Sequence, residues 1–425
     1  MRLQFLQRKL AVFVKMRSLM DKNRVFVSHP TGNTFSRQLL IMLQEFEMLT
    51  HFVTGLRWQK GCFAEKLLSR GLVTQLRRRS FDLPKEKITA RSHKEVLRLF
   101  SERFRVEWLR DRFSVDCIYR ETDELAAKLL DKYPASTVYA YEDGAYETFK
   151  KAKALNIRCC YDLPIAHWRT LREIMGEEAL RLPEWAQTIQ GVNDSTEKLQ
   201  RKDEELDMAD LVVVPSQFVY DSLPEATKAA KPCEIVPFGT YTNNNYTGRL
   251  TPESGPLRIL FAGAMTQRKG LADLFEAIKM LKGAEIELVV MGSLCAPMQF
   301  YRKFCPGFTY EPPRPHEQVL KLMSECDIFV LPSLIEGRAL VQLEALGVGL
   351  PLIISTNTGG DDLVTGPEFT GFQVAPRAPE QIAEKIEWFM GRRSGLDEIK
   401  ENCRRRAASI SWANYRSRLH QLLME

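Results

Sequence analysis

The chain has 425 residues, of which 44% are hydrophobic and 27% are charged, and its formal net charge is +6. This length exceeds one ordinary hydrophobic core, so two domains are expected, and the apolar content argues against extensive disorder. No stretch approaches the roughly 18 uninterrupted apolar residues of a membrane span. The nine cysteines contain no Cys-x-x-Cys pair, which argues against a zinc site and a disulfide framework and favours a cytoplasmic protein.

Residues 3 to 20 have the pattern of a basic amphipathic helix, in which leucines alternate with cations such as Arg8 and Lys15. One interpretation is a helix that lies at a membrane interface. The alternatives, a helix packed on the domain or a disordered extension, are favoured over it.

The first strand is expected over Arg24–Ser28, followed by the loop His29-Pro-Thr-Gly32-Asn33 and a helix over residues 35–49. A strand, a glycine-bearing loop and a helix are typical of an α/β ligand site at the carboxyl end of a strand. A single glycine is equally consistent with an ordinary strand-to-helix turn.

A basic region follows, with 17 Lys and Arg against eight Asp and Glu between Arg57 and Arg120. Such an excess suits an anionic partner, which is a phospholipid surface, a phosphorylated substrate or nucleic acid. A run such as Arg77–Arg79 is also consistent with a solvated face. Nucleic-acid binding would also need aromatic residues among these cations, and Phe81, Phe100, Phe104 and Trp108 supply only a weak version of that pattern, which disfavours nucleic acid.

Strands and helices alternate clearly from Ser136 onward, which predicts a parallel, doubly wound sheet. Strands are expected over 137–141, 157–161, 210–215 and 233–237, and helices over 146–155, from 168 to about 181, and from 216. The strand at 157–161 leads to His167, which would face the ligand crevice of such a sheet. A histidine in this position is more often a structural hydrogen-bonding group.

Residues 241–256 are polar and rich in turn residues, and they predict a linker between two domains. A second series of strands is expected over 257–262, 286–291, 328–331, 351–355 and 372–375, with helices over 271–281, 316–326 and 379–389. We therefore expect an α/β protein with a domain over 1–240, a domain over 257–409, a cleft between them, and a terminal helix over 410–425.

The strand at 328–331 leads to the most informative stretch of the chain. Glu336 lies just before a helix that is expected from Gly337 onward, and Glu344 lies about two turns inside that helix. Free N–H groups and the positive end of the dipole make a helix N-terminus an anion site. Two carboxylates at such a site suit a ligand that carries hydroxyls as well as phosphates, as a sugar nucleotide does.

These motifs resemble the retaining GT-B glycosyltransferases of family 4. The resemblance is carried by Leu260-Phe-Ala-Gly263, Arg268-Lys-Gly270, the pair Glu336 and Glu344 with seven residues between them, Gly349-Leu-Pro351 and Gly359-Gly360. In the first half, Tyr141-Glu-Asp-Gly144, Asp162-Leu-Pro164 and Ala209–Ser216 are similar to a bacterial branch of the same family.

The resemblance implies the GT-B architecture, with two doubly wound Rossmann-like domains. The first domain would hold the acceptor, with Gly32 and Asn33 on its ligand loop, and the second would hold a nucleotide sugar. The terminal helix would pack back on the first domain. The implied catalytic residues are Glu336, His167 and Lys269. The implied donor-binding residues are Arg268, Lys269, Glu344, Gly337, Arg338, Ala339, Leu340, Gly263 and Gly239.

Within this set the resemblance assigns separate roles. Lys269 and Arg268 would hold the donor diphosphate, with the N–H groups of residues 338–340. Glu344 would bind the ribose, Glu336 the transferred sugar, and His167 would lie near the reacting carbon. Two residues depart from the family pattern. Ala264 replaces a frequent arginine, so phosphate binding is expected to be weaker unless Arg268 supplies the missing charge. Arg338 replaces a usual aromatic, which suggests an altered sugar pocket or donor preference.

The expected activity is retaining transfer of a sugar from a nucleotide sugar to a hydroxyl of a glycan or a lipid-linked acceptor. No Asp-x-Asp pattern of metal-binding acids is found, so neither a metal nor another cofactor is expected. The basic first domain suggests peripheral attachment at the inner face of an anionic membrane. The alternatives are a sugar-nucleotide epimerase or hydrolase, and a catalytically inert protein that docks on membrane or nucleic acid.

Overall fold

The computed structural model describes residues 23–66, 68, 70–104, 113–189, 194–240 and 255–425. The predicted amphipathic helix over residues 3–20 lies outside these residues. So do Trp108 and most of the predicted linker.

The first domain is built on a seven-stranded sheet in which every neighbouring pair is parallel, in the order β3-β2-β1-β4-β5-β6-β7. Its strands are β1 (Val25–Ser28), β2 (Leu49–Thr54), β3 (Ile88–Ala90), β4 (Thr137–Tyr141), β5 (Arg158–Asp162), β6 (Leu211–Val214) and β7 (Cys233–Ile235). Its helices are α2 (Thr34–Glu45), α3 (Arg70–Arg77), α4 (Ser92–Phe104), α6 (Val115–Leu129), α7 (Tyr146–Ala154), α8 (Trp168–Arg181), α9 (Thr196–Met208), α10 (Gln217–Ser222) and α11 (Glu225–Ala230).

The second domain has a six-stranded parallel sheet in the order β10-β9-β8-β11-β12-β13. Its strands are β8 (Leu257–Ala262), β9 (Ile286–Met291), β10 (Thr309–Glu311), β11 (Ile328–Leu331), β12 (Leu352–Ser355) and β13 (Gly371–Val374). Its helices are α12 (Leu271–Met280), α13 (Met298–Phe304), α14 (His316–Ser324), α15 (Leu340–Val348), α16 (Asp361–Val364), α17 (Pro379–Met390) and α18 (Leu396–Ser409). The last helix, α19 (Trp412–Met424), follows.

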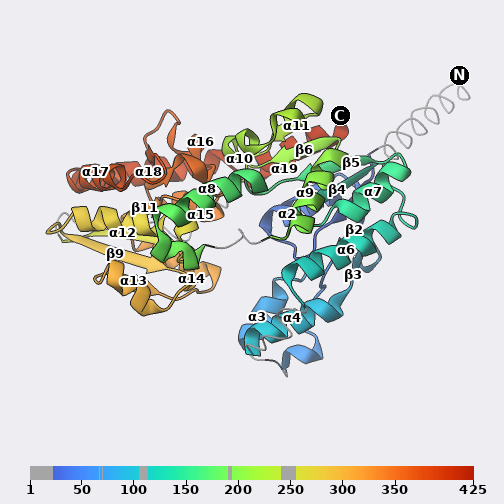
Figure 1. Cartoon of the computed structure of the whole chain (residues 1–425), viewed down its shortest axis with the longest axis horizontal. Coiled ribbons are helices and arrows are strands. Elements are labelled where there is room, and N and C mark those ends of the chain that lie inside the picture. The colour runs from blue at the N-terminus through green and yellow to red at the C-terminus, as the bar shows by residue number, and fades with distance from the viewer. Residues whose placement is uncertain (1–22, 67, 69, 105–112, 190–193, 241–254) are drawn as a thin grey trace, which may run out of the picture.

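Both sheets confirm the predicted α/β class, because each has the strand order of a doubly wound fold. The central strands are apolar on both faces. Residues 328–331 of β11, for example, have no exposed surface, as expected for a parallel sheet with helices on both sides. Figure 1 shows the two domains beside each other, and α19 (red) lies with the first domain rather than the second.

The chain passes twice between the domains, and the two passages touch. Thr240 N–H donates to the Ile410 carbonyl oxygen at 2.8 Å. A Cβ at Gly239 would lie 2.2 Å from the Trp412 nitrogen, so only glycine permits this approach. Helix α19 then packs on α2, where Arg416 Nη1 donates to Gln38 Oε1 at 2.6 Å.

The sequence patterns missed several elements, and each has a physical reason. The helix expected over 35–49 ends at Glu45, because Glu47 adopts a left-handed conformation (φ 55°) and β2 begins at Leu49. Helix α9 was not predicted because its sequence is mainly charged and shows little apolar periodicity. The helix expected from Gly337 begins at Leu340 instead.

Candidate active site

Two cations and a carboxylate meet at the carboxyl ends of β8 and β11. Lys269 Nζ lies 2.6 Å from Glu336 Oε1, and Arg268 Nη1 lies 3.2 Å from the same oxygen. Arg268 also donates from Nη1 to the Ile335 carbonyl oxygen at 2.8 Å. The structure therefore brings Glu336 together with Lys269, from which it is 67 positions away in the sequence, and with the adjacent Arg268.

The Glu336 carboxylate is kept ionised by these cations. Burial by itself would raise its pKa, but the charges of Lys269 and Arg268 outweigh burial, and the pKa of Glu336 lies below its ordinary value. The ion pair therefore contributes stability at neutral pH, and that contribution is lost only when the pH falls through the lowered pKa. In this state the Glu336 carboxylate is paired with Lys269 and Arg268, the two cations that an anionic ligand would bind.

Glycine residues make room for this arrangement. Gly263 has φ +154°, and a Cβ there would lie 2.7 Å from Lys269 Cδ. The lysine side chain therefore crosses the end of β8 directly over Gly263. Gly270, with φ +69°, lies so close to the Pro332 carbonyl oxygen that a Cβ would be 2.0 Å away. Gly270 requires glycine because the Pro332 backbone approaches it closely, whereas Gly263 favours glycine because of its positive φ and leaves room for the Lys269 side chain.

Helix α15 begins just beyond Glu336, but not all of the predicted N–H donors are available. The Ala339 N–H donates to the Thr358 carbonyl oxygen at 3.2 Å, so it is already used. No side chain described in the structure caps α15 at Ala339, which leaves the first N–H groups of the helix, starting at Leu340, for an anion. Gly337 lies against the first domain, where Ser216 Oγ donates to its carbonyl oxygen at 2.6 Å.

The structure shows what the Arg338 side chain binds, and an effect on the sugar pocket or the donor choice stays a prediction. Arg338 is buried and forms a bidentate pair with Asp362, at 2.6 and 2.9 Å. It also donates to the carbonyl oxygens of Phe238 and Gly359. The side chain therefore connects Asp362 and Gly359 of the second domain to Phe238, near the end of the first domain. It does so because a buried guanidinium must satisfy its five donors.

Glu344 faces a cavity of about 480 Å³ at the junction of the domains. Glu344 Oε1 lies 3.0 Å from His316 Nε2, and this hydrogen bond raises the pKa of His316 above its ordinary value. His316 was not among the predicted site residues. The sequence around His316, at the start of α14, contains no recognisable motif. Its contact with Glu344 is therefore seen only in the folded structure.

The same cavity brings together five predicted residues from both domains. Its lining includes Gly32, Asn33, Gly239, Leu340 and Glu344. Asn33 accepts from the Ser36 N–H at 2.9 Å and so begins α2. The cavity volume lies within the range of small-molecule sites.

Part of the basic region also lines this cavity, through Lys60, Arg77 and Arg78. Arg77 forms an ion pair with Glu65, whereas Lys60 and Arg78 extend the positive charge of the wall. Other cations of the region are neutralised locally, since Arg79 and Arg98 both bind Glu95.

His167 forms its hydrogen bonds and an ion pair with residues of the first domain. It is buried at the start of α8, where its Nδ1 accepts from the Arg169 N–H at 3.4 Å. Its Nε2 lies 3.6 Å from Asp203 of α9. Burial lowers the pKa of His167 to about 4, although Asp203 opposes this shift. The structure therefore shows a neutral histidine that begins a helix, and a contact with the transferred sugar stays a prediction.

The structure describes all nine cysteines, and none of them forms a disulfide bond. Within the described ranges, no three His, Cys, Asp or Glu side chains gather in a way that could hold a metal ion. No helix of the same ranges is both long and apolar enough to cross a membrane.

The fold and this site define the class of the protein. Two doubly wound domains that face each other across a cleft, with ligand residues at the strand ends, form the GT-B architecture. Sucrose-phosphate synthase from Thermosynechococcus elongatus superposes with a TM-score of 0.61 at 16% identity, covering 94% of this chain and 98% of that chain. Alr3699/HepE from Anabaena, in complex with UDP and glucose, gives 0.59 at 13% identity, with coverage of 94% and 99%.

Residues 244–408 match the family model described as Glycosyl transferases group 1. The amylovoran biosynthesis glycosyltransferase AmsK of Erwinia amylovora is 32% identical over 122 residues, which are 26% of this chain and 30% of AmsK. The capsular polysaccharide biosynthesis glycosyltransferase CapM of Staphylococcus aureus is 28% identical over 179 residues, 39% and 46% of the two chains. The match thus spans less than half the length of either relative.

Proposed function

We propose that the protein is a retaining glycosyltransferase that moves a sugar from a nucleotide sugar to a hydroxyl of a glycan or lipid-linked acceptor. The observation that carries the proposal is the Glu336 carboxylate held by Lys269 and Arg268, just ahead of the helix whose Glu344 faces the cleft cavity. The match of residues 244–408 to glycosyl transferases supports the same class.

The chemistry follows from what each group can do. The donor diphosphate replaces Glu336 on Lys269 and Arg268, each charge-assisted contact contributing about 1.5–3 kcal/mol. The released Glu336 carboxylate then accepts hydrogen bonds from the hydroxyls of the sugar. When the sugar–phosphate bond breaks, the two cations and the α15 N-terminus stabilise the departing negative charge.

The acceptor hydroxyl attacks the sugar carbon from the side that the diphosphate leaves, so the configuration at that carbon is retained. The hydroxyl proton passes to the phosphate oxygen that leaves, which balances the reaction without a protein base. Because Lys269 and Arg268 supply the positive charge, the reaction proceeds without a metal ion. Gly32 and Asn33, which line the same cavity as Lys60 and Arg78, would meet the acceptor.

The cleft cations favour an acceptor that carries phosphate or carboxylate groups, such as a lipid-linked glycan or an acidic glycan. A protein that acts on a lipid-linked acceptor would work in the cytoplasm at the inner face of the membrane. The name of AmsK refers to amylovoran biosynthesis and that of CapM to capsular polysaccharide biosynthesis, which supports a role in glycan assembly.

A donor screen tests this proposal. UDP-, GDP- and ADP-sugars are each added to the protein, and one of them is expected to raise its melting temperature. With that donor and alkyl glycosides as acceptors, a new glycosidic bond with the donor's anomeric configuration is expected by NMR, and EDTA is expected to leave the rate unchanged. An inverted product, loss of activity in EDTA, or free sugar as the only product would contradict the corresponding part of the proposal.

The His316–Glu344 pair predicts a pH dependence of nucleotide binding. The pKa of His316 is raised by Glu344, so the pair is fully formed below the ordinary value of 6.5 and is lost as the pH rises through the raised pKa. Ribose must displace His316 from Glu344. We therefore expect nucleoside diphosphate affinity to increase about two- to five-fold from pH 6 to 8.5.

Calorimetric titration at several pH values measures this change, with His316→Gln as the matched control. The phosphate groups of the ligand titrate identically with both proteins, so the difference between the two profiles isolates His316. Parallel profiles would show that His316 does not compete with the ligand.

A further inference from the structure

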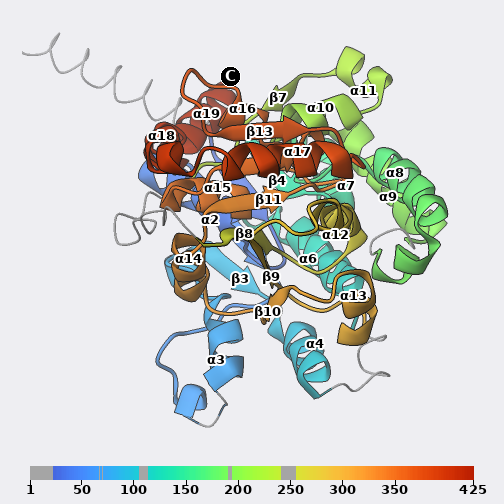
Figure 2. The same cartoon turned by 90° about the vertical axis from the view of Figure 1, so that its left-hand side faces the viewer.

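Residues 168–188 form helix α8 and the 3-10 turn η3 (Pro183–Thr188), and we call them the α8–η3 arm. In the sequence the arm and then α9 lie between β5 and β6, which are neighbours in the first sheet. Its first turn stays with the first domain, where Trp168 Nε1 donates to Asp203 at 2.7 Å. Its remaining length reaches the second domain, as the green helix α8 beside the yellow and orange elements shows (Figures 1 and 2).

An aromatic anchor fixes the end of the arm. Trp185 is 2% exposed, and the ring centroids of Phe300 and Phe304 of α13 lie 4.9 and 5.1 Å from its own. Phe275 of α12 completes the pocket at 6.0 Å. A buried tryptophan contributes large apolar contact area and edge-to-face interactions, so the arm belongs to the packed core of the second domain.

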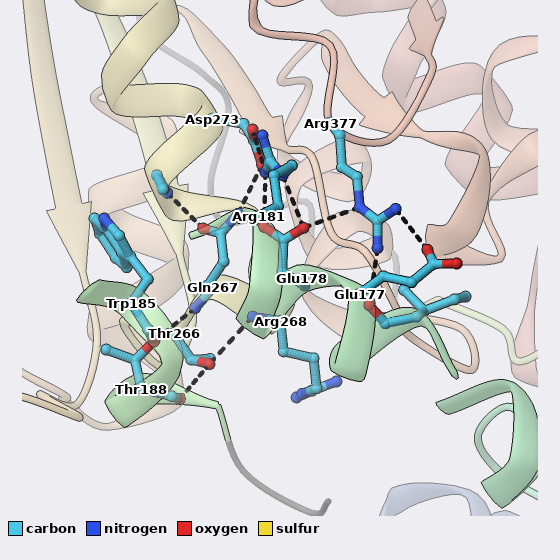
Figure 3. Close-up of polar contacts among 12 residues, drawn as sticks. Glu177, Glu178, Arg181, Trp185, Thr188, Thr266, Gln267, Arg268, Asp273 and Arg377 are labelled. Atoms are coloured by element: carbon cyan, nitrogen blue, oxygen red, sulfur yellow. Dashed lines mark hydrogen bonds and ion pairs between the residues drawn. The ribbon is translucent and has the colours of Figure 1, made fainter. Parts of the chain in front are cut away.

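A buried polar network continues from this anchor (Figure 3). Glu178 has no exposed surface, and its Oε1 accepts from Arg181 Nη2 at 2.6 Å and from Gln267 Nε2 at 2.7 Å. Gln267 Nε2 also donates to Asp273 Oδ2 at 2.8 Å. Arg181 bridges to Asp273 Oδ1 at 2.7 Å. Gln267 directly precedes Arg268, so this network holds the loop of the two cations.

The arm also binds the backbone of that loop. The Gln267 N–H donates to Thr188 Oγ1 at 3.0 Å, and Thr266 Oγ1 donates to the Thr188 carbonyl oxygen at 2.6 Å. Thr266 Oγ1 in turn accepts from the Arg268 N–H at 3.2 Å. Thr266 and Gln267 therefore bind Thr188 directly, and Arg268 is connected to Thr188 through Thr266.

We propose that the α8–η3 arm is a positioning element of the loop that binds the donor diphosphate. Thr188 and Glu178 do not meet the ligand; they fix residues 266 and 267, and these fix the direction of Arg268 and Lys269. The inference rests on the proposed function. If the arm has this role, residues of the first domain, which is proposed to bind the acceptor, also help to set the affinity for the donor. The arm would then connect the two domains at the donor site.

The test uses Thr188→Val, which keeps the shape of the side chain and removes the Oγ1 acceptor. UDP, GDP and ADP are titrated into the wild-type protein, and the best binder is used for all variants. We expect its Kd to rise about ten-fold in Thr188→Val, the KM for the donor to rise with kcat nearly unchanged, and amide hydrogen exchange to accelerate in residues 266–270. Thr188→Ser retains the hydroxyl and is expected to restore wild-type affinity.

A second variant, Gln267→Met, removes the side-chain bonds to Glu178 and Asp273 and is expected to have the same effect. The matched control is Lys303→Ala. It breaks an exposed ion pair of 2.6 Å with Glu184 between the same arm and domain, and it is expected to leave the Kd unchanged. If wild type binds a nucleotide and both loop-side variants bind it equally well, the positioning role is wrong and the proposed function stands. If wild type binds none of the three, the proposed function itself fails.

Discussion

Replacement of Lys269 by alanine is expected to lower kcat/KM for sugar transfer about 100- to 1,000-fold. Lys269 Nζ is the cation nearest to Glu336, at 2.6 Å, and in the proposed reaction it stabilises the departing diphosphate. Removing one preorganised donor to a developing negative charge costs about 2.7–4 kcal/mol. Nucleoside diphosphate affinity is expected to fall as well, because the same charge binds the product.

Initial rates at varied donor concentration and calorimetric titration of the nucleoside diphosphate measure these two effects. Lys279→Ala is the matched control, because Lys279 is an exposed lysine of the same domain that pairs with Glu276. Thermal melting separates a local effect from loss of the fold. Wild-type kinetics in a folded Lys269→Ala protein would remove Lys269 from the mechanism.

Glu336→Gln is expected to separate catalysis from nucleotide binding. The substitution keeps the size of the side chain and removes its charge. Sugar transfer is expected to fall about 100-fold or more, because the contact with the transferred sugar loses its charge-assisted hydrogen bonds. The affinity for the nucleoside diphosphate alone is expected to stay equal or to increase, since the carboxylate no longer competes for Lys269 and Arg268.

Initial rates and calorimetric titration of the nucleoside diphosphate are measured for Glu336→Gln and Lys269→Ala side by side. The lysine variant loses both properties, and the glutamate variant loses only transfer. Glu368→Gln, at an exposed ion pair with Arg405 of the same domain, controls for the loss of a carboxylate. A Glu336→Gln protein that transfers sugar normally, or that loses nucleotide binding in parallel, would contradict the proposed exchange between carboxylate and diphosphate.

The central strands were predictable because parallel strands are buried on both faces and therefore appear as short apolar runs. The runs at 137–141, 257–262, 286–291 and 328–331 match β4, β8, β9 and β11 residue for residue. Polar or marginal elements were not predictable. Strand β2 contains Thr50 and His51, and α9 is dominated by charge, so neither carries a periodic apolar signal.

The candidate active site was also only partly predictable from the sequence. The sequence alone determined which residues lie at strand ends, and the order of Arg268, Lys269, Glu336 and Glu344 pointed to a phosphate-and-hydroxyl ligand. It could not determine what each side chain touches. Arg338 turned out to bind Asp362, and His316 turned out to bind Glu344.

Only the tertiary structure decided that Glu336 rests on the two cations and that the α8–η3 arm lies on the second domain. Local patterns report which residues are buried and with what period, because those depend on neighbours a few positions away. Contacts between Thr188 and Gln267, 79 positions apart, arise only when two domains are packed together. The chain thus encodes its strands and helices locally, and it completes its candidate active site through contacts between distant segments.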